Sequence, residues 1–184
     1  SVMCWPYSRT LALASRWSGY ELDVRTTPRS LADVSSHLPS PVVVHAVRGA
    51  SERAGEGVVN DAESDRAIEL VVGIVQDGVD PSDIAVLTPF VGQSTRIERG
   101  LAERGLAGRD GALVSTVHRL QGGERRVVVF SMTATTRRHV QWVAERPHLL
   151  HVATSRAQDH LVVLLDPDAA RSVPALAPLV ELMG

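Results

Sequence analysis

The chain has 184 residues, of which 44% are hydrophobic and 22% are charged. This much apolar material can form a buried core, which excludes a disordered or low-complexity protein. The net charge of −2 excludes a uniformly basic surface, so any nucleic-acid site has to be a local patch.

The chain contains no lysine, and all 19 of its basic residues are arginines. A phosphate-binding loop of the G-x-x-x-x-G-K-[ST] type needs a lysine to reach the β- and γ-phosphates, so the chain cannot contain such a loop. Cys4 is the single cysteine, and neither an internal disulfide nor a metal site is expected. Because the sequence has no signal peptide and no stretch that could span a bilayer, we expect a cytoplasmic protein without membrane contact.

Residues 1–40 are predicted to form an N-terminal unit, with a short helix within 1–20 and a surface loop after it. The second unit, residues 41–184, begins with the apolar run Val42–Ala46, which indicates a strand. The glycine-rich, charged stretch 48–58 is predicted to be mobile.

A helix is predicted from Asn60 towards Gly78. Asn60 can cap its first turn, and Glu63 can return to the N–H of Asn60 in a capping box. Gly78 offers a left-handed stop. Apolar side chains at a core-facing spacing follow the start of the helix, at Ile68, Val71, Val72 and Val75.

The next buried strand is predicted at Ile84–Leu87, and Thr88–Gln93 leads from it into another helix. Thr88 and Gln93 could contact a nucleic-acid phosphate or a nucleotide there, although Thr-Pro more often only starts a helix. The stretch from Thr133 to Arg146 contains the basic cluster Arg137-Arg138-His139 and is predicted to be a solvated loop.

A polar loop from Thr116 to Glu124 lies between two runs of branched apolar residues. If it leaves the carboxyl end of a parallel strand, it faces the ligand of the domain. Its glycines and its polar side chains suit phosphate and ribose, but spacing alone favours a plain polar turn. The polar groups are those of Thr116, His118, Gln121 and Glu124.

A helix is predicted around Leu149–Ala157, the strand Leu161–Leu165 follows it, and a closing helix is expected after Asp166. Strand candidates alternating with helices predict an α/β three-layer sandwich with a mostly parallel sheet.

The stretch V-S-T-V-H-R-L-Q-G-G-E-R-R-V-V-V-F-S resembles motif V of the superfamily 1 helicases, in the branch of the nonsense-mediated-decay helicase and senataxin. T-P-F-V-G-Q resembles motif IV of that family, and V-A-T-S-R-A resembles motif VI. The resemblance implies a RecA-like second helicase domain, of the P-loop NTPase type. It also implies that residues 1–40 lead in from a first RecA-like domain that is missing here.

The resemblance implies a role for each matching position. Arg156 and Glu124 would be catalytic, with Arg156 as the arginine finger, and Gln121 and Gly122 would join them in binding the nucleotide. The cofactor would be ATP with Mg, bound mainly by the first domain. The partners would be that domain and single-stranded or duplex nucleic acid, whose backbone would be held by Thr88, Gln93, Thr116 and His118.

An alternative function remains open from the sequence. His118, Arg126 and His151 replace the Asp, Asp and Asn that are usual in the branch, which favours a degenerate helicase-like domain that binds nucleic acid or a protein without catalysis. Glu124 and Arg156 are retained, which favours the ATP-dependent helicase.

Overall fold

The computed structural model describes residues 31, 33–55, 57–117, 119, 123–172, 176 and 179–180. The helix predicted within 1–20 and most of the loop predicted after it lie outside these residues. His118, Gln121 and Gly122 lie outside them too, as does the side chain of His151.

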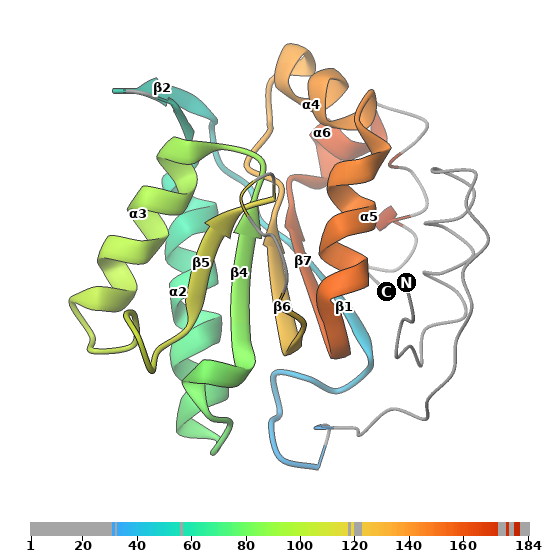
Figure 1. The fold of residues 1–184 in the computed structure, drawn as a ribbon. Coiled ribbons are helices and arrows are strands. Elements are labelled where there is room, and N and C mark those ends of the chain that lie inside the picture. Colours follow the sequence, from blue (N-terminus) through green and yellow to red (C-terminus); the bar gives the residue numbers. More distant parts are fainter. Residues whose placement is uncertain are drawn as a thin grey trace.

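A five-stranded parallel sheet forms the centre of the described part (Figure 1). Its strand order is β1-β7-β6-β4-β5, and each neighbouring pair is parallel. The central strands are buried on both faces, which explains why their sequences are continuous apolar runs rather than alternating ones. The strands are β1 (Val42–Ala46), β4 (Ile84–Thr88), β5 (Leu113–Thr116), β6 (Arg125–Ser131) and β7 (Ala157–Leu165).

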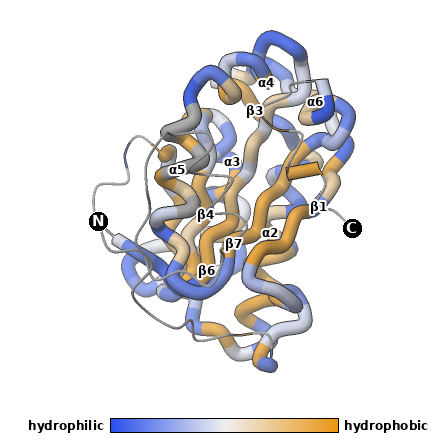
Figure 2. The backbone as a smooth tube through the Cα atoms, turned by 90° about the vertical axis from the view of Figure 1, so that its right-hand side faces the viewer, coloured by the Kyte–Doolittle hydropathy of each residue, from blue (hydrophilic) through white to orange (hydrophobic). Residues whose placement is uncertain are grey.

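Helices cover both faces of this sheet (Figure 1). One face carries α2 (Asp61–Gln76) and α3 (Val91–Ala102), and the other carries α4 (Arg137–Ala144), α5 (Pro147–Arg156) and α6 (Pro167–Arg171). Figure 2 shows the hydrophobic backbone segments concentrated in β4, β6 and β7 between these layers. The predicted three-layer α/β sandwich is confirmed.

The faces of β4 show how the two cores are divided. Ala85 and Leu87 belong to the core under α4, α5 and α6, whereas Ile84 and Val86 belong to the core under α2 and α3. This alternation follows from the two-residue period of a strand. Among the described helices, none has the length and apolar character needed to cross a membrane.

The start of α2 is capped as predicted, but the predicted capping box is wrong in its second half. The side chain of Asn60 accepts a hydrogen bond from the Glu63 N–H at 3.2 Å. The Glu63 carboxyl group turns into the domain instead, and the Asn60 N–H donates to Gln93 Oε1 at 2.9 Å. After the helix, Gly78 has the predicted left-handed backbone, with φ of 104°.

Two segments in which no helix or strand was predicted have regular structure. The stretch 48–58 takes part in a hairpin of β2 (Glu52–Ala54) and β3 (Gly57–Val59), and its predicted mobility stays a prediction. Gly57 lets β3 approach the first turn of α3, since a Cβ there would lie 2.6 Å from the Gly92 nitrogen. The predicted loop from Thr133 contains α4, which Thr136 caps and which buries Val140 and Val143.

Residues on the N-terminal side of the predicted boundary pack against the sandwich. Leu31 and Leu38 are buried in the core under α2 and α3. The Leu31 N–H donates to His160 Nε2 at 2.8 Å, and Ser35 Oγ donates to Asp77 at 2.8 Å. The division after residue 40 stays a prediction.

Candidate functional site

The predicted site residues that the structure describes lie at two opposite edges of the sheet. Thr88 and Thr116 are the last residues of β4 and β5 and pair with each other in register. Glu124 immediately precedes β6, and Arg156 immediately precedes β7. Because all strands run in the same direction, the two threonines lie at the carboxyl edge and the other two residues lie at the amino edge.

The connection 117–124 joins these two edges. It leaves β5 and enters β6, and since these strands flank β4, the connection has to cross β4. Thr116 is level with Thr88, while Val127 is level with Ile84, so the chain returns by most of the length of a strand. By strand geometry the return is on the order of 20 Å. The predicted loop therefore reaches both edges, and its two ends face different sites.

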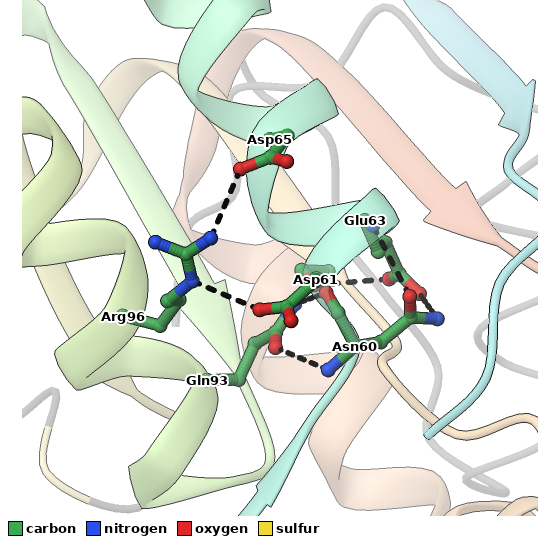
Figure 3. Close-up of polar contacts among 7 residues, drawn as sticks. Asn60, Asp61, Glu63, Asp65, Gln93 and Arg96 are labelled. Atoms are coloured by element: carbon green, nitrogen blue, oxygen red, sulfur yellow. Dashed lines mark hydrogen bonds and ion pairs between the residues drawn. The ribbon is translucent and has the colours of Figure 1, made fainter. Parts of the chain in front are cut away.

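A buried polar network lies at the carboxyl edge, next to the end of β6. Figure 3 shows three of its members, Asn60, Glu63 and Gln93, at the starts of α2 and α3. Glu63 Oε1 accepts hydrogen bonds from Ser131 Oγ at 2.9 Å and from the Thr133 N–H at 2.8 Å. Gln93 Nε2 donates to Ser131 Oγ at 3.0 Å, and Asn60 Nδ2 donates to Glu63 Oε2 at 3.3 Å. The network therefore connects the starts of α2 and α3 to the end of β6.

Glu63 is a carboxyl group in an unusual environment, since its side chain is completely buried. Burial raises the pKa of Glu63 to about 8, against the lowering effect of its hydrogen bonds from Thr133 and Ser131. Burial therefore favours the protonated form of Glu63 relative to an exposed glutamate.

Thr133 has a left-handed backbone conformation, with φ of 65°. Such a conformation costs a β-branched residue about 1–3 kcal/mol and persists only where surrounding contacts hold it. Here the Thr133 N–H donates to Glu63, and its hydroxyl lies 3.1 Å from Thr88 Oγ1. The network thus fixes the chain direction between β6 and α4.

The predicted nucleic-acid contacts are largely inside the domain. Thr88 and Gln93 are 0% exposed and Thr116 is 4% exposed. Thr88 and Gln93 make their hydrogen bonds within the network, so in this arrangement they position α3 and the end of β4. Direct contact of these side chains with nucleic acid stays a prediction.

The amino edge brings together the two predicted catalytic residues. Gln158, at the start of β7, donates through Nε2 to Glu124 Oε2 at 3.3 Å, which links the ends of motifs V and VI. Arg125 pairs in register with Ala157, the residue after Arg156.

The Nε atoms of Arg125 and Arg156 are both buried, and neither has a hydrogen-bond partner within the described part of the chain. His45 Nε2 and Ser64 Oγ are buried without a partner in the same way, so the missing partners alone do not mark a site. What the two arginines add at this edge is positive charge and planar hydrogen-bond donors, which an anionic ligand requires.

Arg126 has a partner of its own at this edge. Its Nε donates to Asp159 Oδ2 at 2.7 Å, and its Nη1 lies 3.9 Å from Asp83 Oδ2. The arginine that departs from the family pattern is therefore accommodated by ion pairs. Across the residues that the structure describes, no cluster of three or more His, Cys, Asp or Glu side chains could hold a metal ion.

We expect Arg126→Asp, the residue usual in the branch, to lower the free energy of unfolding of this chain by about 1–3 kcal/mol. The change would leave the Asp159 carboxylate, whose side chain is 8% exposed, beside a second negative charge. Urea denaturation measures the difference. Adding Asp159→Arg should recover part of the loss, because it restores an ion pair with the charges exchanged. An unchanged denaturation midpoint in the single variant would contradict the structural role of Arg126.

The family of the chain is decided by a sequence comparison. The model of a family described as AAA domain matches residues 7–168. The chain belongs to this AAA domain family.

Similar proteins place this AAA domain more closely. It is 30% identical over 181 residues to the 3'-5' exoribonuclease HELZ2 of Mus musculus, a match that covers 85% of the chain and 6% of that protein. It is 26% identical over 160 residues to the ATP-dependent helicase NAM7 of Saccharomyces cerevisiae, covering 82% of the chain and 16% of that protein. The AAA domain thus spans only a small part of the length of each relative.

A solved structure shows the same fold. It is the C-terminal domain of a possible DNA helicase from Lactobacillus plantarum WCFS1, with a TM-score of 0.51 and 15% identity over 92% of this chain and 94% of that one. The resemblance seen in the sequence is therefore confirmed. The family match and these relatives show that the chain is a C-terminal RecA-like domain of the superfamily 1 helicases, in the branch of the nonsense-mediated-decay helicase.

Some residues of the AAA domain's two edges were not predicted from the sequence. Glu63 was predicted only as part of the helix cap, because a carboxylate three residues after Asn60 is typical of a capping box and gives no sign of a buried network. Arg125 received no role, since the register that places it beside the end of α5 exists only in the folded sheet. The ion pair between Arg126 and Asp159 could not be predicted either, because the two residues become neighbours only when β6 and β7 pair.

Proposed function

We propose that this domain is the C-terminal motor domain of an ATP-dependent DNA or RNA helicase. It would supply motifs IV, V and VI to a nucleotide site shared with a first RecA-like domain. The observation that supports this best is the amino edge, where the buried Nε of Arg156 lacks a partner within the described residues and Glu124 lies at the neighbouring strand.

The side chains at the amino edge fit one half of a nucleotide site. Arg156 would reach the γ-phosphate when the two RecA-like domains close, and Glu124, with Gln121 and Gly122 beside it in sequence, would contact the nucleotide. A planar, permanently charged guanidinium can neutralise the charge that spreads over the phosphoryl oxygens during transfer. ATP with Mg would supply the phosphoanhydride bond, with the metal held mainly by the first domain.

The opposite edge would hold the nucleic-acid backbone. Thr116 ends β5 and pairs in register with Thr88, and His118 follows two residues later in the sequence. Gln93 belongs to the buried network at the same edge. Such contacts would be independent of base sequence, because a motor has to pass every sequence. We further propose that the protein acts in the cytoplasm without membrane contact.

The binding-only alternative is not favoured. Glu124 and Arg156 are both retained, and the Arg126 substitution is explained by its ion pairs with Asp159 and Asp83.

The proposal is tested with the full-length protein. ATP turnover should be measured with single-stranded DNA, with single-stranded RNA and with neither. Turnover stimulated by one of them would identify the substrate, and no turnover under any condition would overturn the enzyme and favour the binding-only alternative.

This chain by itself is expected to fold but not to hydrolyse ATP, because it has no lysine for a phosphate loop. Phosphate release by the purified chain checks this. Turnover that disappears in a Glu124→Gln variant would show that the half-site proposal is wrong.

A further inference from the structure

A groove of about 1080 Å³ lies beyond the carboxyl edge of the sheet, where β4 and β6 end. Three elements form it: the β2–β3 hairpin, the loop from β4 into α3, and α4. Figure 1 shows β2 and α4 at this same end of the sheet. Its lining includes Arg53 from the hairpin, Phe90 from the loop, and Arg137, Arg138 and Trp142 from α4. We call this site the Phe90 groove.

One wall of the Phe90 groove is a row of aromatic side chains that contact one another at tilted angles. The ring centroids of Phe90 and Trp142 are 5.3 Å apart with an interplanar angle of 34°, and the His139 ring lies 6.0 Å from Phe90 on the α4 side. The Arg146 guanidinium carbon lies 4.2 Å from the centroid of Trp142. Phe90 and Trp142 are half-buried and pack against the core, so the rings form a fixed aromatic surface.

The rim of the Phe90 groove is positively charged. Arg53, Arg137 and Arg138 are exposed, and none of them forms an ion pair with an acidic side chain of the described residues. Glu145 is the acidic residue in the lining, and its carboxylate already accepts a hydrogen bond from Gln141. A chain with a net charge of −2 thus carries a local basic patch at this edge.

We propose that the Phe90 groove binds single-stranded nucleic acid, with a base stacked against Phe90 and phosphates contacted by Arg53, Arg137 and Arg138. This inference rests on the proposed function. Fixed aromatic surfaces beside cations are the combination that holds single strands, because every base has a π face and every linkage carries a charge. The buried Thr88 and Gln93 then act indirectly, since their network positions the loop that carries Phe90.

The contacts with phosphate are tested by salt dependence in the full-length protein. Binding of a fluorescein-labelled oligouridine and an oligothymidine is measured by anisotropy over a range of salt concentrations. The double variant Arg137→Ala/Arg138→Ala should reduce the slope of log K against log salt by about 1.4, because each phosphate contact of a single strand contributes about 0.7. The matched control is Arg99→Ala/Arg109→Ala, which removes the same charge from exposed positions away from the groove and should leave the slope unchanged.

The stacking contact is tested by Phe90→Leu, which keeps an apolar side chain against the core. Affinity should fall by roughly 5- to 150-fold with little change in the salt slope. A second readout locates the strand directly. An oligouridine with 5-iodouridine is crosslinked by light, and crosslinks are expected on the peptides that contain Phe90 or Trp142.

The outcomes separate this inference from the function on which it rests. If nucleic acid stimulates ATP turnover but the crosslinks lie elsewhere and the Arg137/Arg138 variant keeps its slope, the groove is not the site and the helicase proposal survives. If the full-length protein binds neither oligonucleotide and hydrolyses no ATP, both proposals are overturned. If Arg99→Ala/Arg109→Ala reduces the salt slope as much as Arg137→Ala/Arg138→Ala does, the proposal for the Phe90 groove is also overturned. The slope would then depend on the total charge of the protein and not on the position of the arginines.

Discussion

Replacing Arg156 by alanine in the full-length protein should lower nucleic-acid-stimulated ATP turnover by a factor of about 10³ to 10⁵. The side chain leaves the end of α5 at the amino edge of the sheet, and its buried Nε lacks a partner among the described residues. A group that acts mainly on the charge of the transition state should affect turnover much more than nucleotide affinity. Steady-state phosphate release and nucleotide titration measure the two effects separately.

Two further variants show which property of Arg156 turnover depends on. Arg156→Lys should restore little, because an ammonium group keeps the charge but not the planar fork. Arg99→Ala, at an exposed position of α3, should have normal turnover. Near-normal stimulated turnover in Arg156→Ala would remove Arg156 from the finger role and make the binding-only alternative the better one.

Replacing Glu63 by alanine should lower the free energy of unfolding by about 3 kcal/mol or more. The change leaves a cavity at a completely buried position and removes the acceptor for Ser131 Oγ and the Thr133 N–H. It also releases the left-handed backbone of Thr133. Urea denaturation measures the loss, and Glu63→Gln is the matched control. Its amide oxygen can still accept the bonds from Ser131 Oγ and the Thr133 N–H, and it loses only the 3.3 Å bond from Asn60 Nδ2, so the loss should be limited to about 1 kcal/mol.

The pH dependence of the same residue has a defined sign. The pKa of Glu63 is raised by burial from 4.5 to about 8, so the folded chain holds this proton more strongly than the unfolded chain. The resulting stabilisation is complete below pH 4.5 and is lost as the pH rises through about 8. Between about pH 5 and about pH 9, the original chain should therefore lose stability relative to Glu63→Gln. Parallel curves for the two proteins would show that Glu63 is ionised throughout.

The presence of a parallel sheet, and the positions of several of its strands in the sequence, could be predicted from local sequence patterns. Val42–Ala46 was predicted with its observed bounds. The buried strand predicted at Ile84–Leu87 is β4, because a strand buried on both faces has a continuous apolar sequence. The cap at Asn60 and the stop at Gly78 were predictable because both depend on neighbouring residues alone.

Features that depend on distant contacts could not be predicted in this way. The helix α4 has polar, arginine-rich sequence and only Val140 and Val143 as its buried side chains, so its short apolar stripe resembles a loop until the core beneath it exists. The buried acid at Glu63 depends on Ser131 and Thr133, whose positions are set by the end of β6. The Phe90 groove likewise requires the hairpin, α3 and α4 together.

The motif V stretch reaches both edges of the sheet. Thr116 ends β5 at the carboxyl edge, and Glu124 immediately precedes β6 at the amino edge. In the proposed motor, this single stretch would therefore contribute one residue to the nucleic-acid edge and another to the nucleotide edge. Two functions that lie on opposite sides of the sheet would then be adjacent in the sequence.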